Sequence, residues 1–130
     1  LILQLNITDS FQINEATTDI LKKYTESSIC ILSSRFEGFG MSIAEAMSCG
    51  IPVVSFNCPC GPRYIIRDGE DGILVENGNV EQLAEKICYL IENEHRRKEM
   101  GRKAHINIKR FETEQIMSQW IKLFEELLRI

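Results

Sequence analysis

The sequence of 130 residues lacks any apolar run near the roughly 18 residues that a membrane-spanning helix needs. It contains no Asp-x-Asp and no Gly-Lys-Ser/Thr, and it has only three prolines and two histidines. The lack of a long apolar run excludes a transmembrane span. The lack of Gly-Lys-Ser/Thr excludes a P-loop nucleotide site, and the few prolines exclude a collagen-like chain. The 44% hydrophobic and 26% charged residues that are present are ordinary for a globular domain, and a chain of this length buries a core without disulfides or a metal.

The net charge of −4 argues against a nucleic acid or another polyanion as partner of the whole chain. Basic residues nevertheless gather in one run, residues 95–110, where seven Lys and Arg stand against the single acid Glu99. Two interpretations of this run stay open: a solvated helix face, or a peripheral contact with a membrane surface or another polyanion.

The five cysteines are an odd number, and Cys58 and Cys60 are the only close pair. A structural zinc site needs four ligands, usually from two such pairs, and the histidines lie far away in sequence. We therefore expect reduced thiols in a cytoplasmic protein. Cys30 and Cys88 fall in apolar periodic runs and are predicted to be small core residues.

Short apolar runs alternate with helical patterns along the chain. Continuous or alternating apolar residues predict strands at 1–5, 29–33, 52–56 and 73–75. Helical spacing predicts helices at 15–26, 42–48, 80–91 and 95–109, and one helical turn at 63–67. A capping box, Asn79 with Gln82, precedes the face formed by Val80, Leu83, Ala84, Ile87 and Ile91. A last helix carries the apolar stripe Met117, Trp120, Ile121, Phe124 and Leu128.

The alternation predicts an α/β fold, a Rossmann-like open parallel sheet with helices on both faces. About four strands are visible, and sheets of this kind are usually larger. The sequence also begins directly in a predicted strand. We therefore expect a piece of a longer protein, truncated at its N-terminus.

The junction between the strand at 29–33 and the helix at 42–48 carries the chemistry. Gly38 and Gly40 let backbone N–H groups approach a ligand closely, and the positive end of the following helix suits a phosphate. Glu37 and Glu45 flank the glycines, and carboxylates accept strong hydrogen bonds from the hydroxyls of a diol. Together these features predict a nucleotide-sugar site.

Structural interpretations of the same residues stay open. Ser42 with Glu45 also fits a capping box, in which Ser42 is the N-cap and Glu45 the third helical residue. Glu37 alone fits an exposed loop acid, and Phe36 and Phe39 fit plain core residues. The dinucleotide fingerprint Gly-x-Gly-x-x-Gly is not matched, because Met, Ser and Ile follow Gly40.

The residues at 34–54 closely resemble the signature of the family-4, retaining, GT-B glycosyltransferases. The similarity comprises Glu-Gly-Phe-Gly at 37–40, a second glutamate eight positions after the first, Glu-Ala-Met at 45–47 and Cys-Gly-Ile-Pro-Val-Val at 49–54. Downstream, Gly-Pro-Arg at 61–63 and Asp-Gly-Glu-Asp-Gly-Ile-Leu-Val at 68–75 resemble the next segment of the family. The resemblance runs from about residue 1 to the end of the chain.

The resemblance implies two Rossmann-like domains that face each other across a cleft. Residues 1–130 would be a partial C-terminal, nucleotide-sugar-binding domain, with an α/β core at 1–110. The terminal helix at 111–130 would return toward the N-terminal domain, which is missing here. The stripe with Trp120 and Phe124 would then be partly exposed; its burial in this domain's own core is the alternative.

The resemblance also implies roles for single residues. Glu45 would accept hydrogen bonds from the ribose diol, and Glu37, the catalytic candidate, would contact the hydroxyls of the donor sugar. The cradle for the sugar and the diphosphate would be Gly38, Phe39, Gly40, Met41 and Ser42. The family's basic Arg and Lys pair belongs upstream and is absent, and Arg35 is not its equivalent. Tyr64 stands where family members often have Glu, in a segment interpreted as structural.

The function implied is that of a retaining hexosyltransferase, which moves a sugar from a nucleotide-diphosphate sugar such as a UDP-sugar to an acceptor. Front-face attack would make catalysis mainly electrostatic, with no metal or other cofactor. The acceptor, a sugar, a lipid-linked glycan or another molecule, is not encoded in this piece, which alone is expected to be inactive. A cytoplasmic location is expected, with the cytoplasmic face of a membrane as an alternative. A non-catalytic nucleotide-sugar-binding module and a GT-B-fold sugar-nucleotide epimerase are the rival functions.

Overall fold

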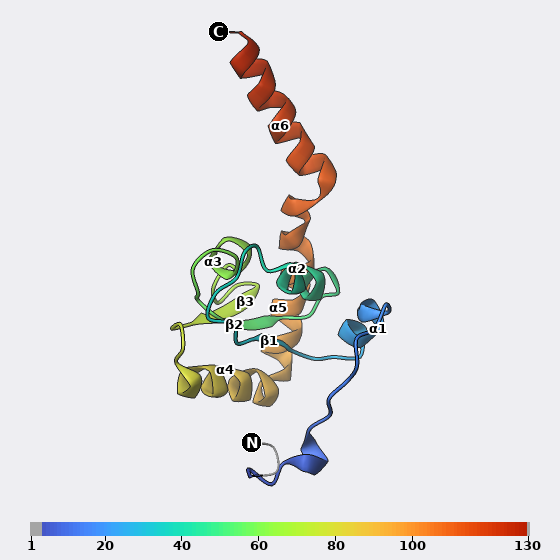
Figure 1. The fold of residues 1–130 in the computed structure, drawn as a ribbon, viewed down its shortest axis with the longest axis vertical. Coiled ribbons are helices and arrows are strands. Elements are labelled where there is room, and N and C mark those ends of the chain that lie inside the picture. Colours follow the sequence, from blue (N-terminus) through green and yellow to red (C-terminus); the bar gives the residue numbers. More distant parts are fainter. Residues whose placement is uncertain (1–3, 130) are drawn as a thin grey trace.

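Three short parallel strands form the centre of the molecule (Figure 1). The structure is a computed structural model that describes residues 4–129. The strands are β1 (Cys30–Leu32), β2 (Val53–Phe56) and β3 (Gly72–Val75), in the order β1-β2-β3. Every residue of the central strand β2 is buried, as expected for a parallel sheet that is covered on both faces.

Helices cover both faces of this sheet, because successive side chains of a strand point to opposite sides. On β2, Val53 belongs to one core cluster and Val54 to the other. On the Val53 side lie α2 (Met41–Ser48) and α3 (Pro62–Ile65); on the Val54 side lie α4 (Val80–Glu92) and part of α5 (Glu94–Asn107). The predicted α/β class, with an open parallel sheet and helices on both faces, is confirmed.

A close backbone contact joins α5 to the end of α2. Gly50 follows α2 with φ +74°, the left-handed conformation predicted for a glycine that ends a helix. A Cβ added at Gly101 of α5 would come within 2.1 Å of the carbonyl oxygen of Gly50. Only glycine at position 101 therefore lets α5 lie against α2 and hold it in place.

The N-terminal segment differs from the prediction. Of the strand predicted at 1–5, residues 1–3 lie outside the described part, and Gln4 and Leu5 form a turn. A 3₁₀ turn, η1 (Thr8–Ser10), follows. The helix predicted at 15–26 is shorter, α1 (Ile20–Thr25), because Thr17, Thr18 and Asp19 have low helix propensity.

The face that α4 buries also differs from the predicted one. Leu83 and Leu90 are buried and Ile87 is half-buried, whereas Val80 and Ile91 are 61% and 59% exposed. Cys88, predicted to be a core residue, is exposed. These residues miss the core because the sheet and α5 cover only one narrow strip of α4.

The predicted cap of α4 is confirmed in its first half. The Asn79 side chain accepts a hydrogen bond from the backbone N–H of Gln82 at 2.9 Å. The Gln82 side chain, however, accepts from the N–H of Glu76 at 2.7 Å rather than from that of Asn79. Its bond therefore ties the residues after β3 to the start of α4.

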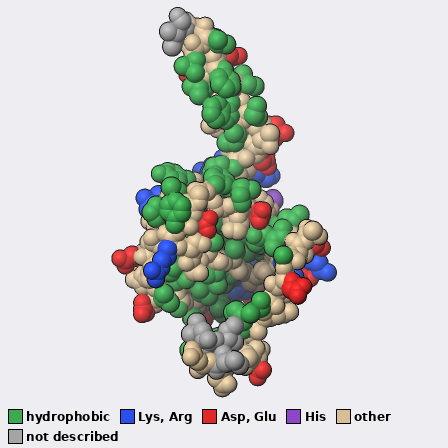
Figure 2. Space-filling view, in the orientation of Figure 1, with side chains coloured by type: hydrophobic (Ala, Val, Ile, Leu, Met, Phe, Trp, Pro, Cys, Tyr) green, Lys and Arg blue, Asp and Glu red, His purple; other side chains and the backbone are tan. Residues whose placement is uncertain are grey.

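The last helix projects away from the sheet. After η2 (Ile108–Phe111), α6 (Thr113–Leu128) extends from the body and buries no residue (Figure 1). Its apolar side chains are visible on the surface in Figure 2, and Trp120 and Phe124 are 49% and 54% exposed. Of the two alternatives for the apolar stripe of α6, exposure and burial in this domain's core, the structure shows exposure. No helix in residues 4–129 is both long and apolar enough to cross a bilayer.

Candidate functional site

The loop between β1 and α2 lies at the carboxyl edge of the sheet, where parallel sheets bind their ligands. Two neighbouring segments hold this loop. The Asn77 side chain, after β3, donates a hydrogen bond to the carbonyl of Arg35 at 3.2 Å. The N–H of Gly61, after β2, donates to the carbonyl of Gly38 at 3.0 Å. The loop that follows β1 is therefore held in place by the segments that follow β2 and β3.

The approach of Gly61 to the loop leaves no room for a side chain. A Cβ at Gly61 would lie 2.6 Å from the carbonyl oxygen of Phe39 and 3.1 Å from Cβ of Glu37. Its φ of +21° lies at the border of the left-handed region, which side chains rarely adopt. The backbone of Gly61 thus packs directly against Glu37 and Phe39 and fixes their positions.

The start of α2 is open, which corrects the capping-box interpretation of Ser42. The N-cap is Gly40, with φ +92°, and no side chain caps the helix. Ser42 is instead the second helical residue and Glu45 the fifth, so Glu45 lies in the second turn and not in the first. Within residues 4–129 the N–H groups of Met41 and Ser42 have no backbone acceptor. Uncapped N–H groups at a helix N-terminus are suited to bind an anion such as a phosphate.

Glu45 is half-buried and has a partner that the sequence pattern did not identify. The hydroxyl of Tyr24, on α1, lies 3.2 Å from Oε2 of Glu45 and 3.3 Å from the carbonyl oxygen of Ser42. Burial and the hydrogen bond to Glu45 raise the pKa of Tyr24 to about 12. Helical spacing marks Tyr24 only as a core-facing residue of its helix. Its polar contact depends on where α1 docks.

Glu37 is half-buried at the base of the loop. None of the ion pairs found in residues 4–129 includes it. The buried Cys58 is its neighbour, and burial together with the Glu37 carboxylate raises the pKa of the Cys58 thiol. Without an ion-pair partner among the described residues, the Glu37 side chain is available for a ligand.

The aromatic residues of the loop form an exposed rim and not core. Phe36 is 70% exposed and Phe39 44% exposed, and the Phe39 ring meets that of Phe111 edge to face at 5.5 Å. Tyr64 is 69% exposed, and its helix α3 buries Pro62 and Ile65. These contacts agree with a structural role for the segment around Tyr64.

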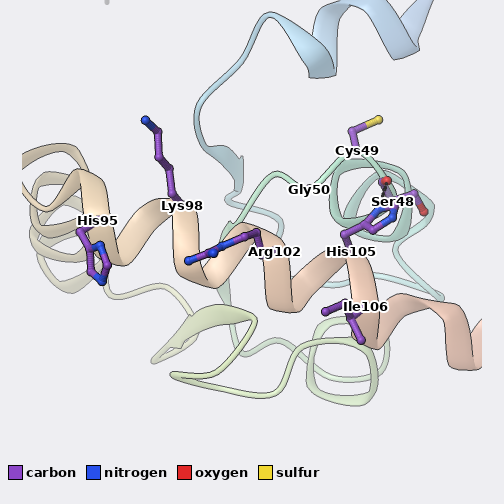
Figure 3. Close-up of a pocket in the computed structure, with 8 residues that line it drawn as sticks. All are labelled: Ser48, Cys49, Gly50, His95, Lys98, Arg102, His105 and Ile106. Atoms are coloured by element: carbon purple, nitrogen blue, oxygen red, sulfur yellow. Dashed lines mark hydrogen bonds between the residues drawn. The ribbon is translucent and has the colours of Figure 1, made fainter.

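A cavity lies at the other end of α2 (Figure 3). It measures about 850 Å³ and is lined by the turn at 48–50 and by α5 residues, four of them basic or histidine: His95, Lys98, Arg102 and His105. His105 Nδ1 lies 2.7 Å from the carbonyl oxygen of Ser48, and Lys98 pairs with Glu94 at 2.6 Å. This cavity adjoins the C-terminal end of α2, so it cannot hold a ligand bound by the N–H groups at its start.

Residues 4–129 contain no cluster of three or more His, Cys, Asp or Glu side chains placed to hold a metal ion. The cysteines are all free, including the pair Cys58 and Cys60.

Comparison with known sequences places this site in a family. The family described as Glycosyl transferases group 1 matches residues 1–107. An exopolysaccharide phosphotransferase of Streptomyces coelicolor is 37% identical over 129 residues, 98% of this chain and 14% of that protein. A poly(ribitol-phosphate) alpha-N-acetylglucosaminyltransferase of Staphylococcus aureus is 38% identical over 109 residues, 83% of this chain and 22% of that protein. The chain thus spans less than a quarter of the length of these two relatives.

Solved structures share the fold over most of this chain. A variant of Staphylococcus aureus TarM, crystallised with UDP, fondaparinux and alpha-GlcNAc-glycerol, matches with a TM-score of 0.88 and 35% identity, over 95% of this chain and 25% of that chain. Anabaena HepE in complex with UDP-glucose matches with a TM-score of 0.85 and 26% identity, over 96% and 35%.

The C-terminal domain of a glycosyl transferase group 1 family protein from Francisella tularensis also matches, with a TM-score of 0.73 and 25% identity over 85% of this chain and 57% of that chain. Its domain corresponds to the position that the resemblance implied. Together with the family match over residues 1–107, these likenesses show that the chain belongs to the glycosyl transferases group 1 family and has the fold of the C-terminal part of a GT-B glycosyltransferase.

Proposed function

We propose that this chain is the donor-binding part of a retaining glycosyltransferase of the hexosyltransferase type, which transfers a sugar from a UDP-sugar to an acceptor. The observation that carries this proposal is the open start of α2 beside two half-buried glutamates, Glu37 and Glu45. The presence of UDP in the TarM complex and of UDP-glucose in the HepE complex supports the choice of donor.

Each part of the site has a task in this proposal. The N–H groups of Met41 and Ser42 bind the diphosphate, where the positive end of the helix dipole stabilises negative charge. The backbone of Gly38, Phe39 and Gly40 approaches the sugar and the diphosphate. Glu45 accepts hydrogen bonds from the ribose diol, and Glu37 accepts them from the hydroxyls of the transferred sugar.

The reaction that fits these tasks is front-face attack by the acceptor hydroxyl. The leaving diphosphate takes up the acceptor's proton, and the hydroxyl's oxygen forms the new bond on the face from which the diphosphate departs. Electrostatic stabilisation of the diphosphate is then the main catalytic contribution of this domain. We further propose that the helix N-terminus performs this task without a metal ion.

The domain arrangement is part of the same proposal. Residues 1–110 form the α/β core of the donor-binding domain, and the exposed face of α6 packs on an N-terminal domain that carries the acceptor site. The location proposed for such an enzyme is the cytoplasm, including the cytoplasmic face of a membrane. The rival is a non-catalytic nucleotide-sugar-binding or scaffolding module. The two carboxylates, Glu37 and Glu45, favour the enzyme, since a scaffold has no need of them.

The test of donor binding is Glu45→Gln in the protein that carries this chain. Gln keeps the size and a hydrogen-bond acceptor for Tyr24 but removes the charge. Hydrogen bonds to charged groups contribute about 1.5–3 kcal/mol, so the Kd for UDP, measured by calorimetry, is expected to rise about tenfold or more. Glu81→Gln, an exposed acid in the first turn of α4, is the control and leaves the Kd unchanged. An unchanged Kd in Glu45→Gln would refute the assignment.

The test of catalysis is Glu37→Ala. UDP binding is expected to persist while the transfer rate falls about a hundredfold, since a loss of about 2.7 kcal/mol of transition-state stabilisation has that effect. If Glu37→Ala transferred sugar at the wild-type rate, Glu37 would have no role in catalysis. A fluorinated donor that labelled Glu37 covalently, detected by mass spectrometry, would contradict front-face attack.

A further inference from the structure

We propose that Tyr24 is a positioning residue for the donor: its hydroxyl donates a hydrogen bond to Oε2 of Glu45 and holds the carboxylate in place for the ribose. This inference rests on the proposed function, because it requires that Glu45 binds the ribose diol. It adds a residue of α1, far from the loop in sequence, to the donor site.

The geometry places Tyr24 where it can do this. Its hydroxyl lies 3.2 Å from Oε2 of Glu45 and 3.3 Å from the carbonyl oxygen of Ser42, and it has one proton to donate. An ionised carboxylate is the stronger acceptor of the two and is also the nearer one. The bond therefore goes to Glu45.

Tyr24 is also the residue through which α1 docks on the domain. It is the one residue of α1 that is not exposed, and it packs against the core cluster that contains Ile43 and Ala46 of α2. Its neighbours Ile20 and Leu21 are 41% and 58% exposed. The ring is thereby fixed against α2, so the hydroxyl is held at one place beside Glu45.

The chemistry leaves Glu45 able to bind the donor. A carboxylate offers about four positions at which it can accept a hydrogen bond, and Tyr24 occupies one of them. About three remain, and a vicinal diol needs two. Since the pKa of Tyr24 is raised to about 12, the phenol stays protonated and remains a donor throughout the neutral and mildly alkaline range. A side chain that is already immobilised loses less conformational freedom when the ligand binds, which strengthens binding.

The experiment compares Tyr24→Phe with the wild type in the protein that carries this chain. Phe keeps the ring that packs on α2 and removes only the hydroxyl. The Kd for UDP is expected to rise about threefold to tenfold, the effect of mobilising one side chain, with kcat little changed and KM for the donor raised. Binding of 2′,3′-dideoxy-UDP, which lacks the diol, is expected to be equal in the two proteins. Tyr89→Phe, on the surface of α4, is the control and binds UDP like the wild type.

A double-mutant cycle separates this inference from the proposed function. In the background of Glu45→Ala, the change Tyr24→Phe is expected to cause no further loss of UDP affinity. If Glu45→Ala alone leaves UDP binding intact, the proposed function itself fails. If Glu45→Ala weakens UDP binding while Tyr24→Phe binds UDP normally, or weakens UDP and dideoxy-UDP equally, the positioning role is wrong and the proposed function stands.

Discussion

At the scale of single residues, the loop between β1 and α2 is shaped by close backbone contacts. Gly61 brings the segment after β2 against the carbonyl of Phe39, and Gly40 ends the loop in the left-handed region without a side-chain cap. Because glycine has no Cβ, it permits both the close approach at position 61 and the left-handed conformation at position 40. The consequence is a loop whose polar backbone atoms stay accessible to a ligand.

Substitution at Gly61 tests this contact. In Gly61→Ala the new Cβ would lie 2.6 Å from the Phe39 carbonyl oxygen, so the loop must shift. We expect a loss of about 2 kcal/mol in the free energy of unfolding, measured by urea denaturation, and weaker UDP binding.

The control for Gly61→Ala is Gly69→Ala, where φ is +73° and nothing lies within 4 Å of the added Cβ. Backbone strain alone is expected to cost about 1 kcal/mol there, with normal UDP binding. Equal effects of the two substitutions on stability and on binding would show that Gly61 serves the turn and not the loop.

At the scale of secondary-structure elements, α6 stands apart from the rest. Its apolar stripe is amphipathic in pattern, yet none of its residues is buried, and the rings of Trp120 and Phe124 lie 5.7 Å apart on its surface. An exposed stripe of this kind marks a surface for another domain or chain. The proposed occupant is the N-terminal domain of the same protein.

The stripe can be tested in the 130-residue chain. Trp120→Glu with Phe124→Glu is expected to change its free energy of unfolding by less than about 0.5 kcal/mol, because exposed side chains contribute little. Leu90→Ala, a fully buried residue of α4, is the contrasting variant and is expected to cost about 2–5 kcal/mol. A loss above 1 kcal/mol in the double variant would mean that α6 packs on this domain after all. In the whole protein, the same double variant is expected to reduce transfer.

At the scale of the whole molecule, the chain has the fold of a C-terminal GT-B domain and spans 14% and 22% of the length of two curated relatives. The proposed reaction needs an acceptor site, which the proposal assigns to the other domain. We therefore expect the 130-residue chain to fold but to transfer no sugar.

Incubation of the chain with a panel of nucleotide-sugars and acceptors, followed by product analysis, measures this directly. The whole protein under the same conditions is the positive control. If the chain alone formed more product than its Glu37→Ala variant, the proposal that the acceptor site lies in the other domain would be wrong.

Local chemistry made much of this protein predictable from its sequence. Apolar runs of three to five residues between helical patterns are enough to indicate a parallel α/β sheet, and three such runs contain the strands of the structure. The glycines and glutamates at 37–45 mark the loop, because close backbone approach and hydroxyl recognition need these residue types. The roles of Glu37 and Glu45 themselves stay predictions.

Other features depend on which segments meet, and no local pattern encodes that. Ser42 and Glu45 have the spacing of a capping box, but the helix begins at Met41 because Gly40 turns the chain there. Leu90 is buried and Ile91 exposed because α5 covers one side of α4 only. The bond from Tyr24 to Glu45 joins residues 21 positions apart. Short-range pattern and residue type are enough to predict the strands β1, β2 and β3, the loop and the family. The start of α2, the buried face of α4, the exposed stripe of α6 and the partner of Glu45 become visible only in the folded molecule, since each depends on how distant segments pack.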